Sequence, residues 1–156
     1  MASTLPKAPS SPLLRDLTHS LPMALLRTRE AVVQRFREVL SRHGLTEQQW
    51  RILRALDGRE GLEVSLLAEQ CQILPPSMSG ILKRMEQRGL IVRKANRADG
   101  RSILVALTGE AQALVEQIKP EIVAVYAEIE RILGRRKLEQ LYILLEALEA
   151  GLKRNS

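Results

Sequence analysis

The chain has 156 residues, which is one domain's worth of polypeptide and enough to bury a core. Its net charge of +6 permits an anionic partner. No stretch approaches the roughly 18 consecutive apolar residues of a membrane span, and the first 30 residues lack the apolar segment of a secretory signal. A single cysteine excludes an intrachain disulfide framework and favours a reducing compartment. We therefore expect a cytoplasmic protein without membrane contact.

The N-terminal part of the chain is predicted to be a tail followed by a helix. Residues 1–12 mix Ser, Pro, Ala and Thr with little to bury, so we expect a flexible tail ahead of a single domain over residues 13–156. From residue 13 to 42 apolar residues return at intervals of three, four and seven, which predicts a helix with one buried face. Pro22 either divides this helix or lies in a first turn after Ser20, because proline disrupts a helix interior.

The middle of the chain is predicted to form three short helices. Thr46 and Gln49 have the spacing of a capping box, which begins the first helix, and a turn through residues 59–63 follows it. Helical spacing then occupies residues 66–71 and resumes over residues 77–87. The last two helices, separated by a short turn, are typical of a helix-turn-helix.

A change of period after the third helix predicts a β-hairpin. Short apolar runs at residues 90–92 and 103–107 suit two strands, and the loop between them has Asp99 and Gly100 at its tip. Two strands around a charged loop form a wing. Residues 46–108 are therefore expected to be a winged helix-turn-helix.

Two further helices are predicted after Thr108, which suits the N-cap of a helix from residue 110 to about residue 133. Pro120 marks either a kink or a boundary in it. The last segment contains a heptad seam, formed by Leu138, Leu141, Leu145, Leu148 and Leu152. Such a seam fits an intramolecular core or a dimer interface. Because the winged unit is too small to bury both terminal regions, we interpret residues 13–44 and 110–156 as dimerisation helices of a mainly α fold.

The basic residues of the chain gather in the winged unit. Residues 75–102 carry seven Lys or Arg against two Asp or Glu, a local charge of +5, and double-stranded DNA is the partner that suits this concentration best. Arg97 is expected to enter the minor groove, and Asp99 to orient the Arg101 guanidinium toward a phosphate. A homodimer would place two such units on a pseudo-palindromic operator. The candidate DNA-binding residues are Ser77, Ser79, Lys83, Arg84, Lys94, Arg97 and Arg101.

The order of these elements resembles the MarR family of bacterial regulators. The residues DGR at 99–101 and LT at 107–108 match the D-x-R-x5-L-T pattern of that family's wing and second strand. A narrower resemblance, to the regulators of homoprotocatechuate and hydroxyphenylacetate degradation, is carried by the segments MALLRTREAVVQRF, LTEQQWRILRAL and CQILPPSMSGILKRMEQRGL. The chain departs from that subgroup in having Pro-Pro where Arg-Pro is usual.

Trp50 and Arg54, with Glu47 one turn earlier, share one face of the first short helix. Trp50 could be a core residue, but the helix already has a separate buried stripe of Ile and Leu. A large aromatic ring beside an arginine suits an aromatic acid, through stacking and a forked donor for the carboxylate. The subgroup resemblance implies an effector pocket between this helix and the dimerisation helices. On matching positions it would contain Ser20, Arg29, Glu47, Trp50, Arg54 and Tyr126, with His19 as a further candidate beside Ser20.

The resemblance implies a repressor of an aromatic-acid catabolic operon, acting at the nucleoid and released from its operator by a small hydroxylated aromatic carboxylate. Hydroxyphenylacetates, hydroxybenzoates and hydroxynicotinates fit equally well. No cofactor or metal is expected, and an enzyme is disfavoured because the chain lacks the common catalytic and metal-binding motifs. Two alternatives stay open, a regulator that senses oxidants through Cys71 and a non-specific architectural DNA-binding protein.

Overall fold

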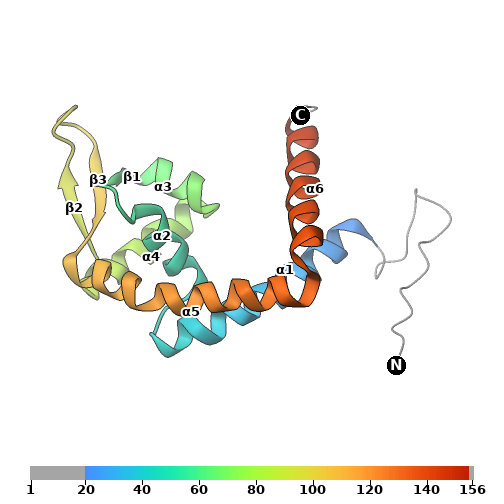
Figure 1. The fold of residues 1–156 in the computed structure, drawn as a ribbon. Helices are drawn as coiled ribbons and strands as arrows, with labels where there is room; N and C mark the ends of the chain where they lie inside the picture. Colours follow the sequence, from blue (N-terminus) through green and yellow to red (C-terminus); the bar gives the residue numbers. More distant parts are fainter. Residues whose placement is uncertain (1–19, 155–156) are drawn as a thin grey trace, which may run out of the picture. The chain divides into compact units, whose positions relative to one another are not determined.

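The computed structural model describes residues 20–154 (Figure 1). The predicted tail and His19 lie outside this range. The chain divides into two compact units, Met1–Arg35 and Phe36–Ser156, and the candidate sites described below belong to the second. No helix in the described range is long and apolar enough to cross a membrane.

The first helix, α1 (Leu21–Arg42), begins after Ser20, whose hydroxyl accepts a hydrogen bond from the Met23 N–H at 3.4 Å. Pro22 lies in the first turn, as one of the two predicted arrangements has it, where a missing N–H costs no intrahelical hydrogen bond. At the other end of α1, Arg42 Nη2 contacts Glu121 Oε2 of α5 (Gly109–Leu133) at 2.6 Å. This end of α1 is thereby tied to the long helix.

The three predicted short helices are present. The capping box of the first is confirmed, because the Gln49 N–H donates to Thr46 Oγ1 at 3.2 Å and the Thr46 N–H donates to Gln49 Oε1 at 3.0 Å. The third begins with two prolines at its first positions, and Gly89, with φ +70°, follows its end. The helices are α2 (Glu47–Leu56), α3 (Val64–Cys71) and α4 (Pro75–Gln87).

The sheet has three antiparallel strands in the order β1-β3-β2, namely β1 (Leu62–Glu63), β2 (Ile91–Ala95) and β3 (Ile103–Leu107). The hairpin of β2 and β3 is the predicted wing. Its register pairs Ile91 with Leu107 and Ala95 with Ile103. The turn predicted over residues 59–63 is wrong at its end, because Leu62 pairs with Val105 and forms β1. Two residues cannot show strand periodicity by themselves, so only this distant partner makes them a strand.

Thr108 joins the wing to the long helix. Its hydroxyl accepts from the Ala111 N–H at 3.1 Å, which caps α5 as predicted, and donates to the carbonyl oxygen of Gly89 at 2.7 Å. Its own N–H donates to the Leu90 carbonyl oxygen at 3.2 Å. Pro120 lies inside α5, so it is not a boundary between two helices. One residue therefore fastens the end of α4 to the start of α5.

The core lies where α2, α3, α4, β3 and α5 meet (Figure 1). Its fully buried side chains include Leu53, Leu67, Leu82, Val105 and Val115. The last helix, α6 (Arg135–Arg154), is different, because none of its described residues is buried. Several of its large apolar side chains are exposed, among them Leu141, Leu144, Leu145 and Leu152. Within the second unit, no described residue of the α6 heptad seam is thus buried, and Leu141, Leu145 and Leu152 are exposed.

Candidate functional site

Helix α4, the second helix of the helix-turn-helix and called the recognition helix below, has one buried and one exposed face. Met78, Ile81, Leu82 and Met85 pack into the core, which fixes the helix on the body of the protein. The predicted DNA-binding residues on this helix, Ser77, Ser79, Lys83 and Arg84, are all exposed. The polar face of α4 is therefore available to a partner.

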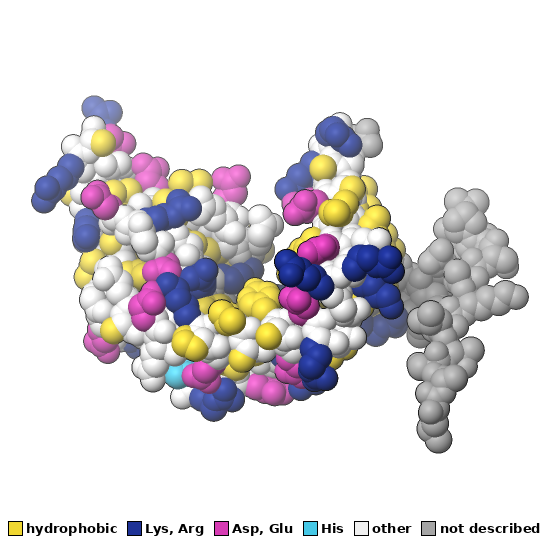
Figure 2. Space-filling view, in the orientation of Figure 1, with side chains coloured by type: hydrophobic (Ala, Val, Ile, Leu, Met, Phe, Trp, Pro, Cys, Tyr) yellow, Lys and Arg dark blue, Asp and Glu magenta, His cyan; other side chains and the backbone are white. Residues whose placement is uncertain are grey.

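The basic residues of the winged unit fall into two groups. Arg88 Nη1 donates to the carbonyl oxygen of Gly44 at 2.7 Å, and Arg93 Nε pairs with Glu86 Oε2 at 3.3 Å. These two were counted in the local charge but not assigned to DNA. The other five, Lys83, Arg84, Lys94, Arg97 and Arg101, are exposed and form no ion pair within residues 20–154. Figure 2 shows basic side chains along the hairpin.

The wing tip is organised by Asp99. Its Oδ1 accepts the backbone N–H groups of Arg101 at 2.7 Å and Ser102 at 3.0 Å, and its Oδ2 accepts the Ser102 hydroxyl at 3.2 Å. These backbone hydrogen bonds lower the pKa of the Asp99 carboxyl. The predicted contact between Asp99 and the Arg101 guanidinium is not what the structure contains. The carboxylate holds the turn instead, and Arg101 is exposed.

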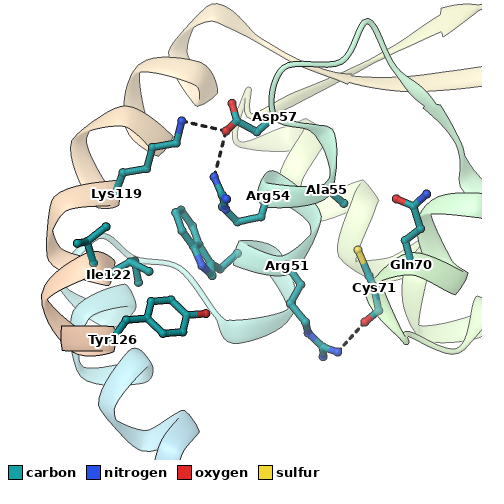
Figure 3. A pocket seen from close by; sticks show the side chains of 11 residues that line it. Arg51, Arg54, Ala55, Asp57, Gln70, Cys71, Lys119, Ile122 and Tyr126 are labelled. Carbon is teal, nitrogen blue, oxygen red and sulfur yellow. Dashed lines mark hydrogen bonds and ion pairs between the residues drawn. The ribbon is translucent and has the colours of Figure 1, made fainter. Parts of the chain in front are cut away.

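A second candidate site is a cavity of about 900 Å³ bordered by α2, the end of α3 and α5 (Figure 3). It brings together three of the predicted effector-binding residues, Trp50, Arg54 and Tyr126. The wall combines aromatic and aliphatic side chains with three cations and one acid. The lining residues are Trp50, Arg51, Arg54, Ala55, Asp57, Gln70, Cys71, Lys119, Ile122, Val123 and Tyr126.

Trp50 and Arg54 form the charged and aromatic end of this cavity. Trp50 is only 8% exposed and belongs to the core, yet it also lines the cavity, so both interpretations of this residue apply. The Arg54 guanidinium lies 5.9 Å from the centroid of its ring, within the range of a cation–π contact. Arg54 Nη1 also contacts Asp57 Oδ2 at 3.1 Å.

Lys119 reaches the same carboxylate from the opposite helix. Its Nζ lies 3.0 Å from Asp57 Oδ2 and also contacts Glu116. Hydrogen bonds to Glu116 and Asp57 raise the pKa of Lys119, which therefore stays protonated. Figure 3 shows Arg54 and Lys119 converging on Asp57 from α2 and α5. Arg54 and Lys119 thus share the carboxylate of Asp57.

Tyr126 borders the cavity from α5. It is half exposed, and its ring meets that of Phe36 edge to face, with the centroids 5.0 Å apart. Glu47, in contrast, is not among the lining residues, and its carboxylate lies 3.5 Å from Arg37 Nη2 and 4.0 Å from Arg51 Nη2. Ser20 and Arg29 belong to the first unit, and His19 lies outside the described residues. Their roles therefore stay predictions.

Sequence reasoning missed the polar residues that complete this cavity. Asp57 follows the end of α2, and Lys119 lies more than sixty positions later, so no local spacing connects them. Arg51 lies beside Trp50 in the chain, and its Nη1 donates to the carbonyl oxygen of Cys71 at 2.6 Å. A systematic count of charged residues near the Trp50 face would have found Arg51 and Asp57 but not Lys119.

Cys71 itself is buried, with 2% of its surface exposed. Burial raises the pKa of its thiol, which opposes formation of the reactive thiolate. Within residues 20–154 no cluster of His, Cys, Asp and Glu has the arrangement of a metal site. The contacts that the lining residues make are ionic at Arg54 and Asp57, cation–π at Trp50 and hydrogen-bonding at Arg51.

Comparisons with known proteins identify relatives of the winged unit and of the chain as a whole. A model of the MarR family matches residues 43–102, which contain the helix-turn-helix and the wing tip. The homoprotocatechuate degradative operon repressor of Escherichia coli is 43% identical over 127 residues, covering 81% of this chain and 86% of that protein. The chain belongs to the MarR family. Like the other members of this family of transcriptional regulators, it is not an enzyme.

Two solved MarR-type structures extend the comparison. NadR in complex with 4-hydroxyphenylacetate is 38% identical, with a TM-score of 0.76, and the match covers 88% of this chain and all of that one. The repressor CouR bound to a 23-mer DNA duplex is 27% identical, with a TM-score of 0.78, over 87% of this chain and 98% of that one. The predicted family, subgroup and fold class, a mainly α winged helix-turn-helix, are confirmed.

Proposed function

We propose that this MarR-family protein represses an operon for the breakdown of an aromatic acid and leaves its operator when a small hydroxylated aromatic carboxylate binds. The observation that carries the proposal is the Trp50 and Arg54 pair in the cavity beside α5. An aromatic surface next to a guanidinium matches the two ends of such an acid. The name of the E. coli relative and the ligand of NadR support the same class of effector.

In the proposed complex with DNA, α4 lies in the major groove and the wing contacts the DNA backbone and the minor groove. Five exposed cations on α4 and the hairpin, which form no ion pair with another described residue, support it, as does the DNA complex of CouR. Two half-sites about one helical turn apart require a homodimer. The exposed leucine seam of α6 supports that assembly. The protein would act in the cytoplasm, at the nucleoid.

Effector and DNA are linked through a population shift. The acid must bind better to dimers whose recognition helices are wrongly spaced for successive major grooves, and its differential affinity sets the extent of release. The cavity has a suitable position for this linkage, because it lies between α2, which packs on the recognition helix, and α5.

The oxidant-sensing alternative through Cys71 is not favoured. A buried thiol with a raised pKa carries little thiolate at neutral pH, and the single cysteine has no partner cysteine in its own chain. An architectural DNA-binding protein would bind operator and random DNA equally and ignore aromatic acids. Competition between the two DNAs therefore separates that alternative from the proposal.

Arg54→Ala tests the effector half. We expect the variant to bind operator DNA as the wild type does but to lose release by 4-hydroxyphenylacetate and the rise in melting temperature that a bound ligand causes. Arg59→Ala, which removes an exposed arginine outside the cavity, is the matched control and should respond normally. If the acid releases Arg54→Ala from DNA as it releases the wild type, the cavity is not the effector site. A panel of hydroxybenzoates and hydroxynicotinates run alongside identifies the acid.

A further inference from the structure

We propose that Asp57 is an internal competitor of the effector: it occupies Arg54 in the effector-free protein, and an acidic effector binds by taking its place. This inference rests on the proposed function, because it concerns the same cavity. It adds a residue that sets how much effector is needed for a response.

The geometry of one oxygen atom carries the proposal. Asp57 Oδ2 lies 3.1 Å from Arg54 Nη1 on α2 and 3.0 Å from Lys119 Nζ on α5. Among the described residues that line the cavity, Asp57 is the only acid, and its side chain is 21% exposed (Figure 3). The carboxylate partner that Arg54 is expected to find in a ligand is therefore already supplied by the chain.

The exchange is chemically balanced. An arriving carboxylate has the same charge and the same acceptor atoms as Asp57, so Arg54 gains only the difference between the two contacts. When Arg54 turns to the effector, Asp57 keeps its contact with Lys119, and neither charge is left without a partner. Lys119 thus keeps the free energy of displacing Asp57 from Arg54 small. Asp57 in turn lowers the affinity for the acid that Arg54 alone would give.

Competition distinguishes acids from their neutral analogues. A ligand that lacks the carboxylate can stack on Trp50 without displacing Asp57, because it has no negative charge with which to replace the Asp57 carboxylate at the guanidinium. The affinity of an acid therefore depends on Asp57, whereas the affinity of the corresponding amide does not.

The test measures binding of 4-hydroxyphenylacetate and 4-hydroxyphenylacetamide to full-length wild type and Asp57→Asn by titration calorimetry. Because exposed ion pairs contribute modestly, we expect the dissociation constant of the acid to fall by about three- to fivefold in the variant and that of the amide to change by less than about twofold. Glu116→Gln, which removes an acid that contacts Lys119 but not Arg54, is the matched control for a simple change of charge. It should leave the acid's affinity within about twofold of the wild type.

Three results would overturn the inference. They are unchanged acid binding in Asp57→Asn, an equal gain for acid and amide, and an equal gain in Glu116→Gln. If Asp57→Asn melts too early to be titrated, Asp57→Ser removes the same carboxylate and is held to the same expectations. Failure of 4-hydroxyphenylacetate and the other acids of the panel to bind the wild type would instead count against the proposed function, so the two failures are distinguishable.

Discussion

Replacing Leu145 by aspartate should separate the proposed dimer into monomers. Leu145 lies in the heptad seam of α6, a helix without a buried residue in the described chain, and it is 39% exposed. A symmetric dimer that covers this seam would bury the side chain twice, once in each protomer. Ala147 lies on the opposite side of the helix, so Ala147→Asp introduces the same charge away from the seam.

The magnitude follows from the exposed fraction. Burying a whole leucine contributes about 1.5–3 kcal/mol, so the exposed two-fifths of Leu145 accounts for about 0.6–1.2 kcal/mol in each protomer and roughly twice that in the dimer. Two carboxylates facing each other without partners cost several kcal/mol more. A total of at least ~4 kcal/mol corresponds to about a thousandfold rise in the dimer dissociation constant.

Sedimentation velocity over a dilution series measures this constant directly. We expect Leu145→Asp to sediment as a monomer at concentrations where the wild type and Ala147→Asp are dimers. Operator binding should fall with it, while affinity for a single half-site is retained. If Leu145→Asp and Ala147→Asp dissociate at the same concentration, the α6 seam is not the interface and the reasoning from exposure is refuted.

Two further predictions concern the wing. Arg97→Ala should reduce the slope of log affinity against log salt concentration by about one, because one phosphate-neutralising cation is lost. Arg93→Ala should change this slope less, because Glu86 already pairs with the Arg93 guanidinium. Equal changes of slope in salt titrations of the two variants would contradict the assignment. The pKa of Asp99 is lowered in the folded wing, so its contribution to wing order is fully present above the ordinary Asp value of about 3.9 and is lost as pH falls through the lowered value. An NMR titration should give a carboxyl midpoint below that of an Asp model peptide, with the Arg101 and Ser102 amide shifts following the same curve; a midpoint at or above the peptide value would contradict the hydrogen-bonding scheme.

The parts of the fold that the sequence predicted are those set by neighbours in the chain. The caps of Thr46 and Thr108 depend on a residue three positions later, and the structure contains both. The heptad spacing of α6 is likewise local. What these patterns predict is whether an element forms and where it begins, because capping and periodicity operate within one or two turns.

The features that were missed depend on partners far away in the chain. β1 exists because Leu62 pairs with Val105, and the acid-binding end of the cavity is complete only when Lys119 approaches Asp57. Arg88, one of the seven cations counted in the winged unit, donates to the carbonyl oxygen of Gly44 in the loop after α1. Such contacts follow from tertiary packing, which no short window of sequence contains.

The hydroxyl of Thr108 has a mechanical consequence for the repressor. Because it binds both Gly89 and Ala111, the recognition helix and the long helix are joined without a flexible link. The 25 residues of α5 span about 38 Å, so a tilt of about 5° around the far end displaces its start by roughly 3 Å. Two protomers tilting in opposite directions would change the separation of their recognition helices by roughly 6 Å, against the ~34 Å between successive major grooves. A rotation of a few degrees in each protomer would thus move the pair out of register with the operator.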